Sequence, residues 1–409
     1  MAVSFPFALR IACSLAVIIA SGASIAFSQP AQAEEAAAND GLVAVEASWH
    51  EKIAARTMEE IDLHNLPSIQ LAVGFRGKLI YENAFGYSDI ASRTRATIAT
   101  QYRTASISKW LTGAATFKLV DEGKIALDQP IQRYCPAYPA KSAPITTRQL
   151  LSHTAGVRHY PDRRLERDRS ASKAQRELIR SQRERDEKSN AIRFTDTIAP
   201  IAFFKDDPLI FPPGRGYAYS SFGFRVLGCV IAGAAGEPYR DFLRASLFEP
   251  LRMDSTQPDD SAATLPSRAT LYDLSRKGKL KLAPVRDVSA NLPAGGHLST
   301  ASDLIRYTLA FANGEVLTPS SRKIMGSQPK GPNGEEIPSG YGHGVDFMSD
   351  FPGSLGHSGR QSGTTTLLLY LPEYDASIAV MSNASGWRTI TPFTAEILTI
   401  LESHVEELG

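Results

Sequence analysis

The chain has 409 residues, of which 44 are Lys or Arg and 43 are Asp or Glu, so its formal net charge is +1. A nearly neutral chain has no overall attraction for a phosphate backbone, which excludes a general nucleic-acid binder. Three cysteines are too few for a disulfide-stapled scaffold, and a hydrophobic content of 43% is that of a globular protein with a core.

The amino terminus has the composition of a secretory signal peptide. Residues 1–33 contain one charged residue, Arg10, followed by an apolar stretch over 11–27 and an A-x-A pattern at 31–33. We expect cleavage there, export to the periplasm or the medium, and no stable membrane association of the mature chain, 34–409. The alternative is an uncleaved membrane anchor, because about 17 apolar residues is the short limit for a span.

Apolar residues at helical spacing predict an amphipathic helix over 43–64. Two β-favouring runs, 68–75 and 79–86, flank a glycine turn and predict a hairpin. The other predicted elements are helices over 106–123, 147–152, 222–248 and 390–406 and strands over 364–371 and 376–383.

This order of elements predicts the fold class. Strands from the two ends of the chain can pair into one antiparallel sheet, while the middle forms a separate, mostly helical lobe. We therefore expect an α+β fold, an α/β sandwich in which N- and C-terminal helices flank the sheet, with one domain over 34–409. A cleft between the sheet and the helical lobe is the expected place for a ligand.

A charged insert, residues 158–200, interrupts the helical lobe. Its segment 163–188 contains ten basic and six acidic side chains. A solvated helix or a mobile loop is one interpretation of such a run. The others are a lid over the cleft and a surface for self-assembly.

The remaining cysteines and histidines give no metal signature. Export permits a disulfide between Cys135 and Cys229, but the sequence does not place them within bonding distance. None of the eight histidines stands in a ligand spacing, so we expect neither a metal site nor another cofactor.

One of four S-x-x-K patterns, Ser106–Lys109, opens a helix whose following turns are apolar. Residues three apart share a helix face, so the lysine amine lies one turn from the serine hydroxyl. A serine hydroxyl is a weak nucleophile without a base. Lysine serves as that base only when burial or positive potential, such as a helix amino terminus provides, lowers its pKa. Taken alone, Ser106 is more simply interpreted as a helix cap than as a catalytic residue.

Five segments in the same order resemble signatures of the serine β-lactamase and penicillin-binding-protein family, in its class C-like branch of DD-peptidases and esterases. Together they span roughly residues 66–385. Within the branch, the loop after residue 152 and the segment around Tyr219 are most similar to the mitochondrial serine β-lactamase-like members. The segments are 104–131, the "SHTAG" loop in 145–157, Tyr219-Ser220-Ser221 for Tyr-x-Asn, 293–304, and His357-Ser358-Gly359 for Lys-Thr-Gly.

The resemblance implies roles for the first three residues. Ser106 would be the acylated nucleophile and Lys109 its proton acceptor or relay. Tyr219 would be a general base in acylation and an acid for the leaving group. Its phenolate form would be favoured by a nearby lysine cation.

Two departures from the family pattern concern the substrate. Ser221 replaces an amide side chain and cannot offer the same donors and acceptor. His357 replaces a permanent cation, so binding of a substrate carboxylate should be weaker or pH-dependent. Both argue against efficient β-lactam turnover.

The resemblance also assigns backbone roles. Gly359 would let its strand approach the substrate beside Ser358, and the amides of Ser106 and Arg360 would form the oxyanion hole. His153 and Gly156 would shape the cleft floor. Because no glutamate motif for a deacylating water is found, deacylation would be slow.

These observations predict an exported serine hydrolase that acts through an acyl-enzyme on small peptide-like amides or esters, without nucleic acid. One alternative is a catalytically weak binding or scaffold protein with the same fold. Another is a true β-lactamase or DD-carboxypeptidase.

Overall fold

The computed structural model describes residues 47–404 and 406, except 163, 167, 169 and 285. Residues from Ala47 onwards form one compact unit. The predicted signal peptide, 1–33, and the first residues of the predicted helix 43–64 lie outside the described residues. No helix in the described part of the chain is long and apolar enough to cross a membrane.

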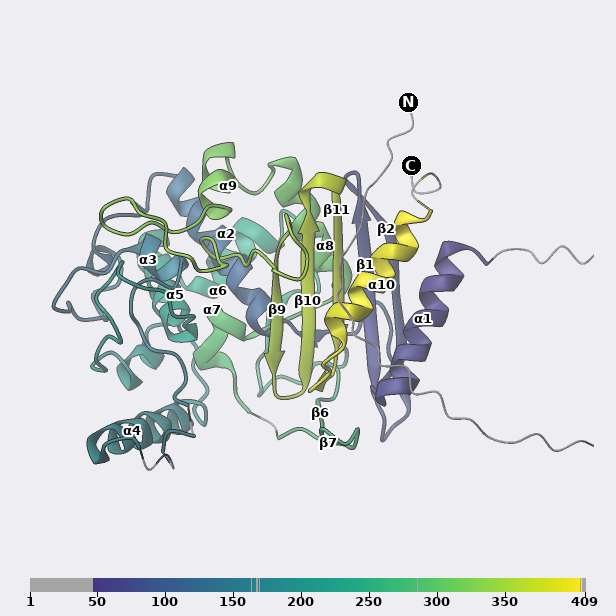
Figure 1. Cartoon of the computed structure of the whole chain (residues 1–409), viewed down its shortest axis with the longest axis horizontal. Helices are drawn as coiled ribbons and strands as arrows, with labels where there is room; N and C mark the ends of the chain where they lie inside the picture. The colour runs from purple at the N-terminus through teal and green to yellow at the C-terminus, as the bar shows by residue number, and fades with distance from the viewer. Residues whose placement is uncertain are drawn as a thin grey trace, which may run out of the picture. The chain divides into compact units, whose positions relative to one another are not determined.

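A six-stranded antiparallel sheet forms the centre of the fold (Figure 1). The predicted hairpin pairs with the C-terminal strands, since Leu71 of β1 lies opposite Val380 of β11. The pairing of strands from both chain ends is therefore confirmed. In spatial order the strands are β3 (Thr94–Arg95), β2 (Lys78–Asp89), β1 (Ser68–Phe75), β11 (Ala376–Ser382), β10 (Thr364–Leu371) and β9 (Leu355–Gln361).

Successive side chains along these strands face opposite sides of the sheet, and they belong to two different hydrophobic clusters. Leu367 and Leu369 belong to the cluster that contains α1 (Trp49–His64) and α10 (Ile390–Glu402), which lie over one face of the sheet in Figure 1. Leu368 belongs to the other cluster, which contains α8 (Ala301–Asn313) and the helical lobe. This period of two makes the sheet the middle layer of an α/β sandwich, and the α+β fold class is confirmed.

The helical lobe follows the predicted order with one correction. The expected continuous helix 222–248 is broken, because Gly236 ends α5 with a positive φ of 76° and Pro238 follows. The helices of the lobe are α2 (Ser108–Asp121), α3 (Thr147–Leu151), α4 (Lys173–Ser189), α5 (Ser221–Ala235), α6 (Tyr239–Leu243), the π-helix Arg244–Phe248, α7 (Leu292–Gly295) and α9 (Pro319–Met325).

Short strands and turns connect the lobe to the sheet. One small sheet contains β4 (Tyr102–Arg103), β8 (His297–Ser299) and β5 (Gln257–Pro258), and the other contains β12 (Ala384–Ser385), β6 (Tyr272–Leu274) and β7 (Leu280–Leu282). The 3₁₀ turns are Ala105–Ile107, Ile131–Arg133, Ala199–Phe203, Ser289–Asn291 and Pro372–Tyr374.

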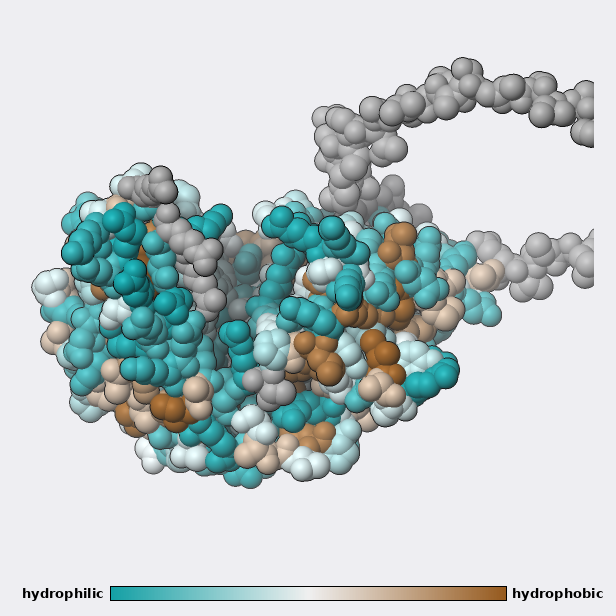
Figure 2. Space-filling view, turned by 90° about the horizontal axis from the view of Figure 1, so that it is seen from below, coloured by the Kyte–Doolittle hydropathy of each residue, from teal (hydrophilic) through white to brown (hydrophobic). Residues whose placement is uncertain are grey.

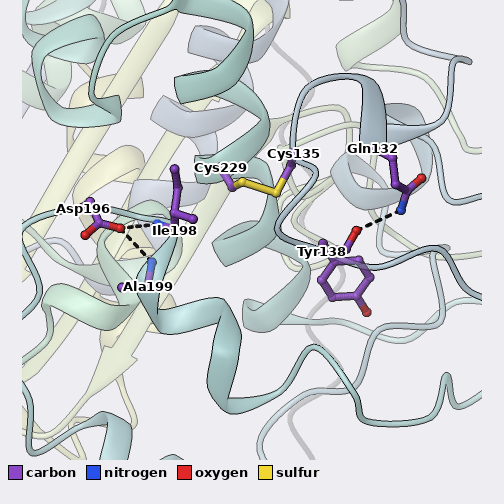
Figure 3. Close-up of a disulfide and its surroundings, with 7 residues drawn as sticks. All are labelled: Gln132, Cys135, Tyr138, Asp196, Ile198, Ala199 and Cys229. Atoms are coloured by element: carbon purple, nitrogen blue, oxygen red, sulfur yellow. Dashed lines mark hydrogen bonds between the residues drawn. A yellow bond between two sulfur atoms is a disulfide. The ribbon is translucent and has the colours of Figure 1, made fainter.

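A disulfide holds α5 to the loop that follows the 3₁₀ turn 131–133 (Figure 3). Cys135 and Cys229 are bonded with their Cα atoms 5.4 Å apart. The contact is close, because a Cβ added at Gly233 would lie 1.8 Å from the carbonyl oxygen of Tyr134. The pairing that the sequence left open is therefore present in the structure.

Candidate active site

Ser106 is presented by a strained turn just before α2. It lies in the 3₁₀ turn 105–107, and α2 begins only at Ser108, so Ser106 does not start the helix itself as predicted. Ala105 has a φ of 45°, which a residue with a side chain rarely adopts. Every other residue over 101–117 is buried, whereas Ser106 is partly exposed. The fold thus places one hydroxyl of this segment at the surface of a cleft.

Lys109 is completely buried beneath that hydroxyl. Its Nζ donates to Ser106 Oγ at 3.2 Å and to the carbonyl oxygen of Ala294 at 2.7 Å. The amine also lies 4.8 Å from the ring centre of Tyr219. Burial holds the pKa of Lys109 well below its usual range, and the positive charge of Arg225 lowers this pKa further. The lowered pKa favours the neutral amine, whose lone pair can accept the proton of Ser106 when the direction of this contact reverses.

The structure corrects the expected state of Tyr219. Its side chain hydrogen-bonds Ser106, but burial raises the pKa of the phenol well above the ordinary value of 10. The lowered pKa of Lys109 also weakens the positive charge that would favour a phenolate. The raised pKa favours the protonated phenol, which is suited to donating a proton rather than accepting one.

His357 is a neutral, fully engaged side chain. Its Nδ1 lies 2.7 Å from the carbonyl oxygen of Ser358 and its Nε2 lies 3.2 Å from Tyr341 Oη. A carbonyl only accepts, so Nδ1 carries the hydrogen and Nε2 accepts from the phenol. Burial is the main cause that lowers the pKa of His357 to about 3, and a proton on Lys109 would lower it further. A pKa this low leaves His357 without the positive charge that would bind a carboxylate near pH 7, in line with the weaker carboxylate binding expected from the sequence.

The "SHTAG" loop supports the segment that carries Tyr219. His153 Nδ1 accepts from the amide of Ser220 at 3.1 Å, and the His153 ring lies 4.4 Å from that of Tyr219. The amide of Ser221 donates to His159 Nδ1 at 3.1 Å. At Gly156, φ is 71° and a Cβ would lie 2.2 Å from a backbone oxygen. These contacts agree with the shaping role predicted for His153 and Gly156.

Strand β9 lies directly against the turn that carries Ser106. A Cβ added at Gly359 would lie 2.5 Å from the carbonyl oxygen of Thr104 and 3.0 Å from Ala105 Cβ. Only glycine permits this approach. It brings β9 against the turn that carries Ser106, while the oxyanion hole formed by the Ser106 and Arg360 amides stays a prediction. The Arg360 side chain itself is exposed.

Six of the eight predicted site residues line one cleft of about 580 Å³. Figure 2 shows this part of the surface hollowed beside the hydrophilic region on its left. Lys109 and Gly359 are not at the cleft surface but lie directly behind it, through the contacts given above. The six lining residues are Ser106, Tyr219, Ser221, His357, Ser358 and Arg360.

The charged insert forms one wall of this cleft. Asp186 of α4 is buried and binds Arg158 at 2.7 Å, and Arg158 also binds Asp207 at 2.5 Å. Arg158 follows the "SHTAG" loop directly, so this ion-paired cluster fastens α4 to the active-site loop. Arg183 and Asn190 are further lining residues. The insert is thus a packed helix at the cleft, not only a solvated charge run.

The sequence did not indicate Tyr341, His159 or Arg225, all of which contact or polarise the site. Tyr341 lies in a glycine-rich segment without secondary structure of its own, and Arg225 lies in the middle of an apolar helix. No local sequence pattern at Tyr341 or Arg225 indicates that the residue reaches the active site. Within the described residues, no group of three or more His, Cys, Asp or Glu side chains is arranged to hold a metal ion.

Comparison with known families identifies the fold. The family model described as Beta-lactamase matches residues 52–397. The chain belongs to the β-lactamase family. The match includes all eight predicted site residues, so the resemblance of the ordered motifs is confirmed at the level of the family.

Curated β-lactamase-family relatives include the serine beta-lactamase-like protein LACTB, mitochondrial, of Homo sapiens, which is 31% identical over 61% of this chain and 54% of its own. Protein flp of Staphylococcus aureus is 24% identical over 81% of this chain and 62% of its own. The chain spans only about half the length of the LACTB relative.

Solved structures share the β-lactamase-family fold. An octameric penicillin-binding protein homologue from Pyrococcus abyssi matches with a TM-score of 0.67 at 24% identity, over 86% of this chain and 77% of its own. The D-amino acid amidase from Ochrobactrum anthropi matches with a TM-score of 0.68 at 21% identity, over 86% and 99%. At these identities the structural likeness establishes the fold.

Proposed function

We propose that this β-lactamase-family chain is a serine hydrolase that forms an acyl-enzyme at Ser106. The observation that carries the proposal is the contact of 3.2 Å between the buried Lys109 amine and the partly exposed Ser106 hydroxyl. A neutral amine beside a serine hydroxyl is the arrangement that nucleophilic catalysis requires. It opens onto a cleft large enough for a small substrate.

In the proposed acylation step, Lys109 takes the Ser106 proton as Oγ attacks the substrate carbonyl carbon. The carbonyl electrons move onto oxygen, where the amides of Ser106 and Arg360 would donate to the developing negative charge. When the tetrahedral intermediate collapses, the bond to the leaving amine or alcohol breaks. Tyr219 gives its proton to that leaving group, and the Lys109 ammonium returns a proton to Tyr219.

Deacylation reverses these roles with water as the nucleophile. Water adds to the acyl carbon, its proton passes through Tyr219 and Lys109, and Ser106 leaves with a hydrogen restored. No dedicated carboxylate was found for this water in the sequence, so we propose that deacylation is the slower step.

The proposed substrates are small peptide-like amides or esters rather than β-lactams. A β-lactam presents an amide and a carboxylate, for which the family pattern provides an amide side chain and a cation. Here Ser221 and the neutral His357 stand in those places. The exposed Arg360 at the cleft offers a cation at the end of the same strand, where the carboxylate of a peptide-like substrate can reach it.

We propose export of the chain because a buried disulfide, Cys135–Cys229, adds to the signal-peptide pattern of residues 1–33. Disulfides of this kind persist in oxidising compartments. Self-assembly through 158–200 stays a prediction. It is supported by the octameric state of the Pyrococcus abyssi homologue, whereas α4 is already engaged at the cleft.

A fluorophosphonate probe tests the proposal, because it phosphonylates only an activated serine. We expect labelling of the wild type and none of Ser106→Ala. Ser320→Ala is the matched control, since Ser320 opens an exposed S-x-x-K pattern in α9 and its loss should leave labelling unchanged. Absence of labelling in folded wild-type protein would favour the binding or scaffold alternative. A panel of D-Ala-D-Ala peptides, other peptides, p-nitrophenyl esters and a chromogenic cephalosporin then assigns the substrate class.

A further inference from the structure

Arg225 is a buried cation close to the active site that lacks a carboxylate partner. Its side chain on α5 is 1% exposed. Nε donates to Asn291 Oδ1 at 3.3 Å and Nη2 donates to Tyr160 Oη at 3.0 Å, while Nη1 has no hydrogen-bond partner. Neither of these two partners, an amide and a phenol, carries a negative charge.

A neighbouring arginine shows that this arrangement is exceptional. Arg158 and Arg225 both stack on the ring of Phe222, at 4.2 Å and 4.3 Å from its centre. Arg158 is neutralised by Asp186 and Asp207, as is usual for a buried guanidinium. An arginine cannot shed its charge in a protein, so the unpaired Arg225 costs folding free energy. Such a local conflict is characteristic of functional sites.

We propose that Arg225 is a positioning residue for the reaction at Ser106: its unpaired buried guanidinium imposes a positive potential on the chamber that holds the Lys109 amine. The inference rests on the proposed function. Arg225 lies one residue after Phe224, whose ring centre is 5.6 Å from Lys109 Nζ. The chamber walls are apolar or aromatic there, so water screens the charge poorly.

The groups that face Lys109 leave Arg225 as the dominant charge. From the "SHTAG" loop come His153 and His159, and from β9 comes His357. Burial lowers the pKa of all three, to about 4 for His159 and about 3 for His357, so they are neutral at pH 7. Asp346, at the cleft, acts on Tyr219 and Tyr341, and burial raises its pKa.

A positive potential at this point serves the reaction in two ways. It adds to burial in favouring the unprotonated Lys109 amine, which can receive the Ser106 proton. It also favours the negative charge that develops on oxygen when Ser106 attacks. Arg225 contacts neither the substrate cleft nor the reacting atoms, so its effect is electrostatic rather than direct.

The test is the pH dependence of the fluorophosphonate labelling rate. In wild type the labelling rate should rise with pH as Lys109 loses its proton, and we call this rising part of the pH profile the acid limb. A unit charge near a poorly hydrated group shifts the pKa of that group by on the order of one unit. In Arg225→Met the acid limb should therefore move up by about one pH unit, and Arg225→Lys should restore it.

A second variant tests the charge without removing the arginine. Asn291→Asp places a carboxylate beside Nε, so the acid limb should again move to higher pH, whereas Asn291→Ala should leave the limb in place. This pair keeps the test decisive if Arg225→Met does not fold.

The outcomes separate the two proposals. An acid limb that stays at the wild-type pH in both Arg225→Met and Asn291→Asp, with only the plateau rate reduced, would mean that Arg225 is merely structural. Failure of wild-type protein to label at any pH would instead overturn the proposed function.

Discussion

Four buried histidines make the fold sensitive to acid. Burial lowers the pKa of His297 and His357 to about 3, that of His343 to about 4 and that of His153 well below 6.5. In the unfolded chain each titrates near 6.5. Because the folded pKa values are depressed, the unfolded state binds more protons below pH 6.5. The stabilisation is complete above pH 6.5 and is lost as pH falls towards the folded pKa values.

The magnitude follows from the proton difference. Each histidine that stays neutral while its unfolded counterpart is charged loses about 1.4 kcal/mol of stability per pH unit. Between pH 6.5 and pH 5 this amounts to about 2 kcal/mol for each of His297, His343 and His357, or about 6 kcal/mol for these three, and His153 acts in the same direction. Domains are stable by only about 5–15 kcal/mol, so we expect acid unfolding to begin near pH 5.

Urea unfolding at pH 7 and pH 5 measures this loss directly. His343→Gln removes one buried titrating group outside the cleft, so the difference in unfolding free energy between the two pH values should shrink by about 2 kcal/mol. His50→Gln, at an exposed position, is the matched control and should leave the difference unchanged. A wild-type protein equally stable at pH 7 and pH 5, or a His343→Gln variant with an undiminished difference, would refute the reasoning.

Three further predictions concern the disulfide, the insert and the cleft. The bond between Cys135 and Cys229 closes a separation of 94 residues, so replacing both with serine should cost about 3–5 kcal/mol in urea unfolding; a loss under 1 kcal/mol would contradict this. Asp186→Asn leaves the buried Arg158 underpaired, so trypsin should cut α4 faster, and an unchanged cleavage rate would show that the pair does not fasten the helix. Arg360→Ala should raise KM for substrates bearing a carboxylate several-fold while leaving KM for neutral esters unchanged, and equal effects on both would exclude a charge role.

The sheet was predictable because its signal is local. Runs such as 364–371 and 376–383 are continuously apolar and β-favouring, and their pairing with the N-terminal hairpin follows from the layer rules. Strand β9 has no comparable apolar run, since His357, Ser358 and Gly359 fill its centre. Only the motif indicated a strand there.

The candidate site was predictable in its residues but not in their charge states. The spacing of Ser106 and Lys109 fixed their proximity. The raised pKa of Tyr219 depends on burial by segments far away in sequence, which no local pattern encodes. The same holds for Arg225, because its missing counter-ion is visible only when every neighbour has been placed.

The α4 helix illustrates the same limit. A capping box at Ser172 and Gln175 signals its start, but its docking depends on a buried ion pair with a residue of the active-site loop. A run of charged residues predicts a solvated helix, because the sequence does not show which distant residues it pairs with.

The most direct test of the central claim is to map the fluorophosphonate adduct by peptide mass spectrometry in wild type and in Lys109→Met. We predict an adduct on the peptide that carries Ser106 in wild type. In Lys109→Met, with folding checked by thermal unfolding, the labelling rate should fall by at least about 10²-fold because the base is lost. An adduct on another serine, or wild-type labelling of Ser106 in Lys109→Met, would contradict the account.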